Sequence, residues 1–187
     1  MKFKAPAFLI ALALTAPLAL SAQADAPALP AAATADQATT SKLVYGLLSD
    51  SRYAYRPKAL DEAMSKDVFK RYLESLDAGK QFFTQADVAK FAPFEANIAE
   101  AIRGGQLEPA FQVFAVYRQR VAQRVGYART LLKQEPDFST DERFEYDRKD
   151  VPWAASDAEL DELWRKSVKN DWLRLKLAGK KPDDIRK

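Results

Sequence analysis

Apolar side chains recur every three to four residues along most of this chain, which is the spacing of one face of an α-helix. One long run opens with Ser156 and Glu159, a capping box in which the serine oxygen and the glutamate carboxylate each accept a backbone N–H at the helix start. Its apolar positions are Leu160, Leu163, Trp164, Val168, Trp172 and Leu175. The repeat predicts an all-α, bundle-like domain of about five helices.

Two helices are expected near the start of this domain. Thr40 or Ser41 can cap the first, because a hydroxyl oxygen accepts a free N–H of the first turn. The second covers about residues 65–76, and Gly79 is expected to close it. The apolar face of the first helix consists of Leu43, Val44, Leu47 and Leu48.

A third helix is predicted to begin at Thr84, where Asp87 three residues later makes an acidic variant of the capping box. Pro93 interrupts the segment, so a break or kink is expected near it before the helix ends at Gly104 and Gly105. The apolar face of this segment is formed by Phe91, Phe94, Ile98 and Ile102.

A fourth helix is predicted from Pro109 to about Lys133. Its predicted apolar stripe is Phe111, Phe114, Val121, Val125 and Leu132. Four arginines are interpreted as its solvated side, with an anionic partner as the alternative. They are Arg118, Arg120, Arg124 and Arg129.

The helical rhythm fails over residues 135–155, the one irregular connection expected in the domain. Phe144 and Tyr146 alternate with charged residues there, which predicts a short extended piece. Four other aromatic residues lie on the helices before and after it and are interpreted as core, with an exposed groove for a partner as the alternative. They are Tyr117, Tyr127, Trp164 and Trp172.

The N-terminus has the three-part layout of a secretory signal. Two lysines precede a charge-free stretch whose most apolar part covers residues 8–20, and Ala22 and Ala24 place small side chains where a signal peptidase requires them. A transmembrane anchor would need about 20 predominantly apolar residues, and prolines interrupt this run. Residues 1–24 are therefore predicted to be a signal peptide that is cleaved after Ala24.

Composition points to an exported, nearly neutral chain. The sequence has 29 Lys and Arg against 26 Asp and Glu, and the signal peptide removes two lysines and no acid. Without a concentrated basic run, nucleic acid is not an expected partner. Cysteine is absent, so an exported domain of this kind fits the bacterial periplasm without a disulfide framework. Residues 25–38, rich in alanine and proline, are expected to form a flexible leader.

The last nine residues predict the start of another helix. Gly179 can adopt the left-handed conformation that ends the preceding helix. Pro182, Asp183 and Asp184 then suit a first helical turn, where proline has no N–H to lose and acids face the positive helix end. Residues 179–187 are therefore expected to be the beginning of a truncated helix in a longer polypeptide.

No catalytic, metal or cofactor site is predicted in this chain. Asp61 with Glu62, and Asp161 with Glu162, are carboxylate neighbours along a helix and point in different directions. Histidine and cysteine are both absent, and there is no acidic loop with calcium spacing and no glycine-rich phosphate loop. We therefore expect no catalytic, metal-binding or cofactor-binding residue in this chain.

Two separated blocks of the sequence resemble the N-terminal helical domain of periplasmic tail-specific proteases, the carboxy-terminal processing peptidases. The first block comprises residues 69–77 and 82–88. The second comprises residues 138–149, 152–153, 159–169 and 173–177. The resemblance covers the signal layout and nearly everything from about Thr39 onward, and it assigns residues 39–178 to that domain.

In that family the helical domain precedes a peptide-binding PDZ module and a protease core that uses a serine–lysine pair. The resemblance implies that this chain lacks the catalytic pair and acts as a scaffold. Its implied partners are the PDZ and protease domains of the same polypeptide, protein substrates, and a periplasmic or outer-membrane adaptor. The alternative is a stand-alone periplasmic interaction module without enzymatic activity.

The last predicted helix is the expected docking element of this scaffold. Val168, Trp172 and Leu175 lie toward its C-terminal end on the wide apolar face. If a following domain normally covers them, the isolated chain would expose an unusually large apolar patch. Burial of the same residues in the domain's own core is the alternative, because periodicity alone does not distinguish the two.

Overall fold

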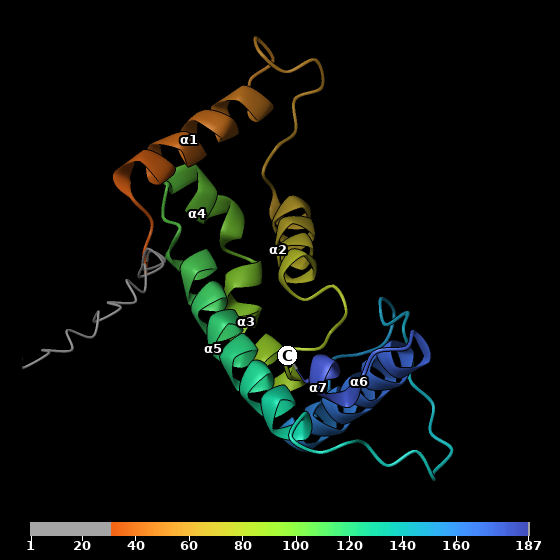
Figure 1. Ribbon diagram of the computed structural model, residues 1–187. Coiled ribbons are helices and arrows are strands. Elements are labelled where there is room, and N and C mark those ends of the chain that lie inside the picture. The colour runs from red at the N-terminus through yellow and green to blue at the C-terminus, as the bar shows by residue number, and fades with distance from the viewer. Residues whose placement is uncertain (1–30, 187) are drawn as a thin grey trace, which may run out of the picture.

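The computed structural model describes residues 31–186, and their regular structure is helical throughout (Figure 1). The described part contains seven helices: α1 (Ala35–Ser49), α2 (Glu62–Leu76), α3 (Gln85–Glu95), α4 (Ile98–Gly104), α5 (Glu108–Leu131), α6 (Asp157–Leu177) and α7 (Pro182–Ile185). The predicted all-α class is confirmed. The predicted signal peptide, including Ala22 and Ala24, lies outside the described residues. None of the helices within residues 31–186 is both long enough and apolar enough to cross a membrane.

The predicted extended piece around Phe144 and Tyr146 is not a strand. The two rings instead pack edge to face, 5.0 Å between centroids, in an irregular connection between α5 and α6. The one isolated β-bridge recorded for the described residues pairs Thr84 with Ala154. An alternating pattern forms a strand only when a partner strand is available, and the described helices provide none.

The first helix begins earlier than predicted. Thr34, not Thr40 or Ser41, is the N-cap of α1, and it forms a full capping box with Gln37. Alanine suggested a flexible leader, but it is also a good helix former. Because Thr34 caps the first turn, the residues that follow it are helical. Ala35 to Ala38, at the end of the predicted leader, are therefore helical.

The helices α2 to α4 follow the predicted pattern with one correction. Thr84 and Asp87 form the predicted capping box of α3, and the expected break after Pro93 separates α3 from α4. The α2 helix ends at Leu76, as predicted, but its C-cap is Asp77 rather than Gly79. The reason is the Asp77 carboxylate, which accepts N–H groups of the following loop and so requires the chain to turn at once.

The core lies where α2, α3, α4 and α5 meet. Phe83 is fully buried and packs edge to face on Phe91, with the ring centroids 5.5 Å apart. Burying one such phenylalanine contributes about 2–3 kcal/mol. The buried apolar cluster consists of Phe69, Leu73, Phe83, Phe91, Ile98 and Val113. In Figure 1, α5 runs along the molecule between α1 at one end and α6 with α7 at the other.

The predicted turn at the end of the chain is present. Gly179 has a φ of +81°, the left-handed conformation that suits glycine, and Pro182 opens the short helix α7. This helix folds back on α6, so that Ile185 and Trp172 are both buried and the Arg186 guanidinium lies 5.5 Å from the Trp172 ring centroid. The last described residues thus complete the packing of α6.

Candidate functional site

The junction of α3, α5 and α6 is organised by a buried carboxylate. Asp87 accepts hydrogen bonds from the backbone N–H and hydroxyl of Thr84, and from Nε and Nη2 of Arg120 at 2.8 and 3.1 Å. Burial opposes ionisation of Asp87, but the hydrogen bonds from Arg120 and Thr84 outweigh it and hold the pKa of Asp87 below its usual value. The same guanidinium reaches Asp157 at the start of α6 at 2.5 Å. One arginine therefore joins three helices.

A second arginine repeats this connection one turn further along α5. Arg124 is buried and pairs with Asp161 of α6. The prediction that the α5 arginines form a solvated side is therefore wrong for Arg120 and Arg124, and it holds for Arg118 and Arg129, which are exposed. The predicted apolar stripe is also displaced, since Val113 is the buried apolar residue of α5 while Val125 is exposed.

The loop between α2 and α3 is the anchor for the chain that follows α5. Asp77 is 2% exposed and accepts the N–H groups of Gln81, Phe82 and Phe83, together with Nε1 of Trp153 at 3.2 Å. The Trp164 indole donates to the Gln81 carbonyl at 2.7 Å. These bonds fix the irregular connection and α6 against the core.

A further ion-pair network ties the irregular connection to the outer side of α6. Glu142 accepts from Nη2 of Arg165 at 2.6 Å and from Nζ of Lys169 at 2.7 Å. The hydrogen bonds from these two cations lower the pKa of Glu142 to about 2. The network leaves the carboxylate ionised throughout the neutral range, so its role is positional.

The residues predicted as a docking surface on the last helix do not form one exposed apolar face. Trp172 is 1% exposed and belongs to the α6–α7 packing, which corrects its placement on an exposed surface. Val168 and Leu175 are half-buried. Four aromatic residues were predicted to be core. Trp172 is buried, whereas the remaining three are half-buried: Tyr117, Tyr127 and Trp164. The apolar residues of α6 that do reach solvent are Leu173 and Leu177, 40% and 80% exposed.

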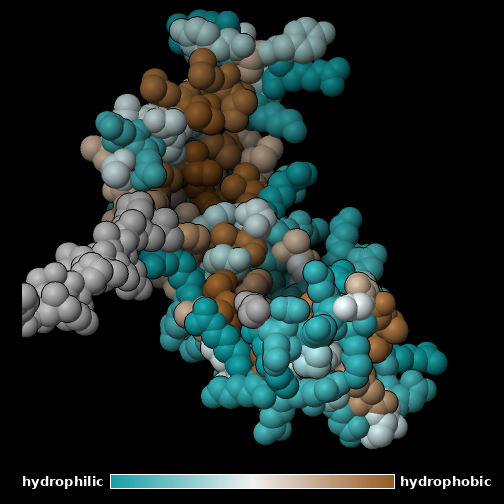
Figure 2. Space-filling model, in the orientation of Figure 1, coloured by the Kyte–Doolittle hydropathy of each residue, from teal (hydrophilic) through white to brown (hydrophobic). Residues whose placement is uncertain are grey.

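The largest departure from expectation is α1, whose predicted apolar face points to solvent. Leu43, Val44, Leu47 and Leu48 are 46–63% exposed, and Tyr53 and Tyr55 in the following loop are 65% and 97% exposed. Figure 2 shows this apolar surface at the end of the molecule that α1 forms. We call these six residues, with Arg52, Arg56 and Lys58 of the same loop, the α1 tip. Sequence periodicity identified the apolar face but not which way it points.

Several serine hydroxyls and neighbouring carboxylates within residues 31–186 have defined hydrogen-bond or ion-pair partners. The described serine hydroxyls that form hydrogen bonds do so with backbone groups or with Asp137, and none is bonded to a lysine amine; Ser65, for example, is buried and accepts the Ala99 N–H. The adjacent carboxylates Asp161 and Glu162 have separate arginine partners. No group of three or more His, Cys, Asp or Glu side chains in this part of the chain has the arrangement of metal ligands.

The fold and the junction together define a helical domain in which ion pairs of Arg120 and Arg124 join α3, α5 and α6. Residues 47–187 match the family model described as the tail specific protease N-terminal domain, and the chain belongs to that family. A tail-specific protease of Haemophilus influenzae is 33% identical over 133 residues, which cover 71% of this chain and 19% of that protein. The chain thus spans about a fifth of the length of this relative.

Proposed function

We propose that this chain is the non-catalytic N-terminal helical domain of a tail-specific serine endopeptidase, which degrades or trims proteins from their C-termini. Its task is to scaffold the PDZ and protease parts of that enzyme. The observation that carries this proposal is the arginine–carboxylate junction. Arg120 and Arg124 lock α5 to α6, so anything attached beyond α6 is held at a fixed angle to the core.

Docking of the neighbouring parts is assigned to the far end of α6. Leu173 and Leu177 are exposed there beside half-buried Val168 and Leu175, while Trp172 supports the helix from its buried side. A periplasmic or outer-membrane adaptor is a further candidate occupant of the same apolar residues. The domain is proposed to reach the periplasm through the signal in residues 1–24, cleaved after Ala24.

Exchange of the domain tests the scaffold role. A chimera of the Haemophilus influenzae tail-specific protease, carrying this chain's residues 47–187 in place of the matching segment, should cleave an unfolded substrate with an apolar C-terminus. The same chimera with Arg120→Ala and Arg124→Ala should lose most of this activity while Arg118→Ala keeps it. An inactive but folded chimera, or equal activity with and without the two junction arginines, contradicts the proposal.

Two simpler measurements accompany the exchange. Residues 25–187 alone should not cleave the substrate above a blank, and activity that survives repurification and disappears on replacing one serine would overturn the non-catalytic assignment. Export is checked by mass spectrometry of the periplasmic form, whose N-terminal residue should be Asp25. A protein that retains Met1 and stays with the membrane fraction would contradict it.

A further inference from the structure

The α1 helix presents its apolar side outward, and its other side contacts α4. The Ser41 hydroxyl donates to the Ile102 carbonyl of α4 at 2.9 Å, and Arg103 of α4 lies over the Tyr45 ring. On the opposite side Leu43 is 63% exposed and Leu47 is 54% exposed. A surface helix normally turns such a stripe toward the core, so this one is built to meet something else.

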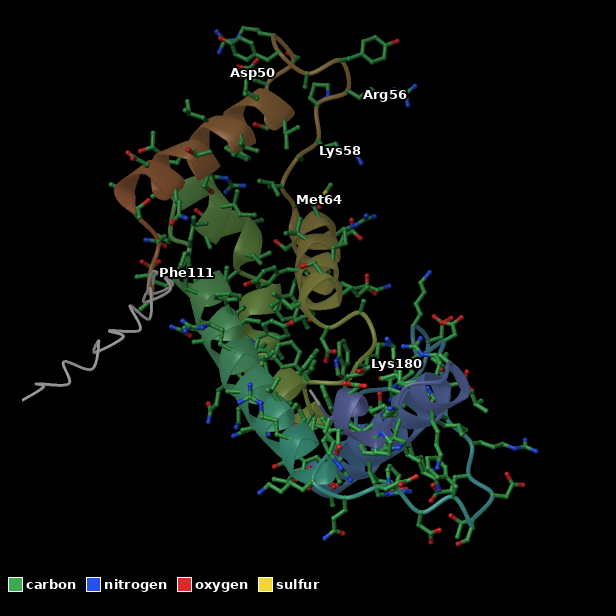
Figure 3. All side chains as sticks on the ribbon, viewed as in Figure 1. Asp50, Arg56, Lys58, Met64, Phe111 and Lys180 are labelled. Atoms are coloured by element: carbon green, nitrogen blue, oxygen red, sulfur yellow. The ribbon has the colours of Figure 1, made fainter. Side chains whose placement is uncertain are left out.

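The loop that follows α1 adds aromatic rings and positive charge to the same end. Between Ser51 and Leu60 there are three cations and two tyrosines but no acidic residue. The guanidinium of Arg52 lies 5.5 Å from the Tyr53 ring centroid and that of Arg56 lies 6.0 Å from the Tyr55 ring centroid. Figure 3 labels Asp50, Arg56 and Lys58 along this loop at the end of the molecule.

Backbone hydrogen bonds give this loop a defined shape. The N–H groups of Tyr53 and Ala54 both donate to the Asp50 carbonyl, and the Lys58 N–H donates to the Leu48 carbonyl at 3.0 Å. Asp50 forms an ion pair with Arg52, and the hydrogen bonds from Arg52 lower the pKa of the Asp50 carboxyl. The charges of Arg56 and Lys58 are not balanced by any ion pair recorded in this loop.

We propose that the α1 tip is a peripheral binding surface for an anionic phospholipid bilayer. The leucines would enter the boundary between headgroups and acyl chains, the tyrosines would lie at headgroup level, and Arg56 and Lys58 would face lipid phosphates. The charge distribution favours a bilayer over a second copy of this chain, because a symmetric pair meeting at the tip would bring like charges together. Tyr55, 97% exposed at the loop, suits a broad interface better than a groove.

Vesicle binding tests this assignment directly. Residues 25–187 contain the whole described fold and lack the signal region, which would itself bind lipid. They should co-sediment with vesicles of phosphatidylglycerol and phosphatidylcholine but not with phosphatidylcholine alone, and added salt should release them. Replacing Arg56 or Lys58 by serine should each weaken binding about fivefold, whereas Arg118→Ser, an exposed arginine on α5, should leave it unchanged.

The apolar part of the tip has its own matched control. Leu43→Gln with Leu47→Gln should lower vesicle binding at least about tenfold, while Leu177→Gln on α6 should not. In a Tyr55→Trp variant, nitroxide-labelled lipid should quench the emission added by the new tryptophan. Circular dichroism establishes that each variant is folded.

Three outcomes would overturn the proposal: no preference for anionic vesicles, equal loss with Arg56→Ser and Arg118→Ser, or no quenching of Trp at position 55. If the protein self-associates without lipid, and Leu43→Gln with Leu47→Gln abolishes that association, the surface instead binds a second copy of this chain. Because vesicle binding involves no proteolysis, its failure is distinguishable from failure of the scaffold role.

Discussion

Arg120 on α5 and Asp87 on α3 form the central ion pair of this domain, with Nε and Oδ2 2.8 Å apart and both side chains largely withdrawn from solvent. The Asp87 carboxylate also belongs to the capping box at the start of α3. Local helix formation and long-range packing thus share one acceptor. Removing the arginine would leave a buried carboxylate with only its Thr84 partners, which is far costlier than losing an exposed pair.

The first prediction concerns the stability of this junction. Arg120→Ala should lower the free energy of unfolding by about 3 kcal/mol, because it leaves a buried charge without its partner. Arg118→Ala, on the exposed side of the same helix, should change it by no more than about 0.5 kcal/mol. Urea denaturation followed by circular dichroism measures both. Equal effects would mean that the junction does not hold the helices together.

The second prediction concerns pH. Since the pKa of Asp87 is lowered in the folded state, its ionised form stabilises the fold above the unfolded value of 3.8, and this contribution is lost as the pH falls through the lower folded value. The Asp87→Asn protein has no carboxyl group at this position, so its stability lacks this contribution and its pH dependence. The stability difference between the two proteins should therefore be largest near neutral pH and shrink below about pH 4. A difference that grows on acidification would contradict the assignment.

The third prediction compares two glycines near the contact of α1 with α4. Gly105 has a φ of +69°, and a Cβ there would lie 2.8 Å from the Ala38 carbonyl oxygen of α1. Gly105→Ala should therefore destabilise the domain by more than the roughly 1–2 kcal/mol cost of the left-handed conformation alone. Gly46→Ala, inside α1 with open space around it, should stabilise by about 0.5–1 kcal/mol. Thermal unfolding of both variants checks the opposite signs.

The fourth prediction concerns Trp172, which is 1% exposed between α6 and α7. Trp172→Ala should cost about 3–5 kcal/mol, as expected for an indole removed from a packed interior. Leu177→Ala, at a site 80% exposed on the same helix, should be nearly neutral. The Trp172→Glu protein provides the contrary outcome. If it is folded and sedimentation shows less self-association than for the wild type, Trp172 belongs to a docking surface and not to the core.

The sequence was a good guide wherever the determining interactions are local. The capping box of Thr84 and Asp87, the break after Pro93 and the left-handed Gly179 each depend on residues within a few positions of one another. The Ser156 cap of α6 also formed, although the Glu159 carboxylate accepts the N–H of Ala155 rather than that of the serine.

The errors arose where distant residues decide the outcome. Arg124 is charged and therefore appears solvated, but Asp161 of another helix compensates its burial. Leu43 and Leu47 are apolar and therefore appear buried, but no described helix covers them. Asp77, rather than Gly79, caps α2 because the loop to α3 folds around its carboxylate and Trp153, 76 positions later, reaches the same oxygen. Contacts between distant residues, or their absence, cannot be predicted from the periodicity of the sequence.

Because α1 contains no buried residue, we expect this helix to behave as a separate unit in hydrogen exchange. It packs mainly on α4, so detaching it exposes little of the central cluster around Phe83 and Val113. Its amides should exchange through local opening, while those at the cluster wait for global unfolding. The outer helix can thus open and reclose many times during the lifetime of one folded core. The lipid-facing end and the interlocked end of this domain are then free to respond to their surroundings independently.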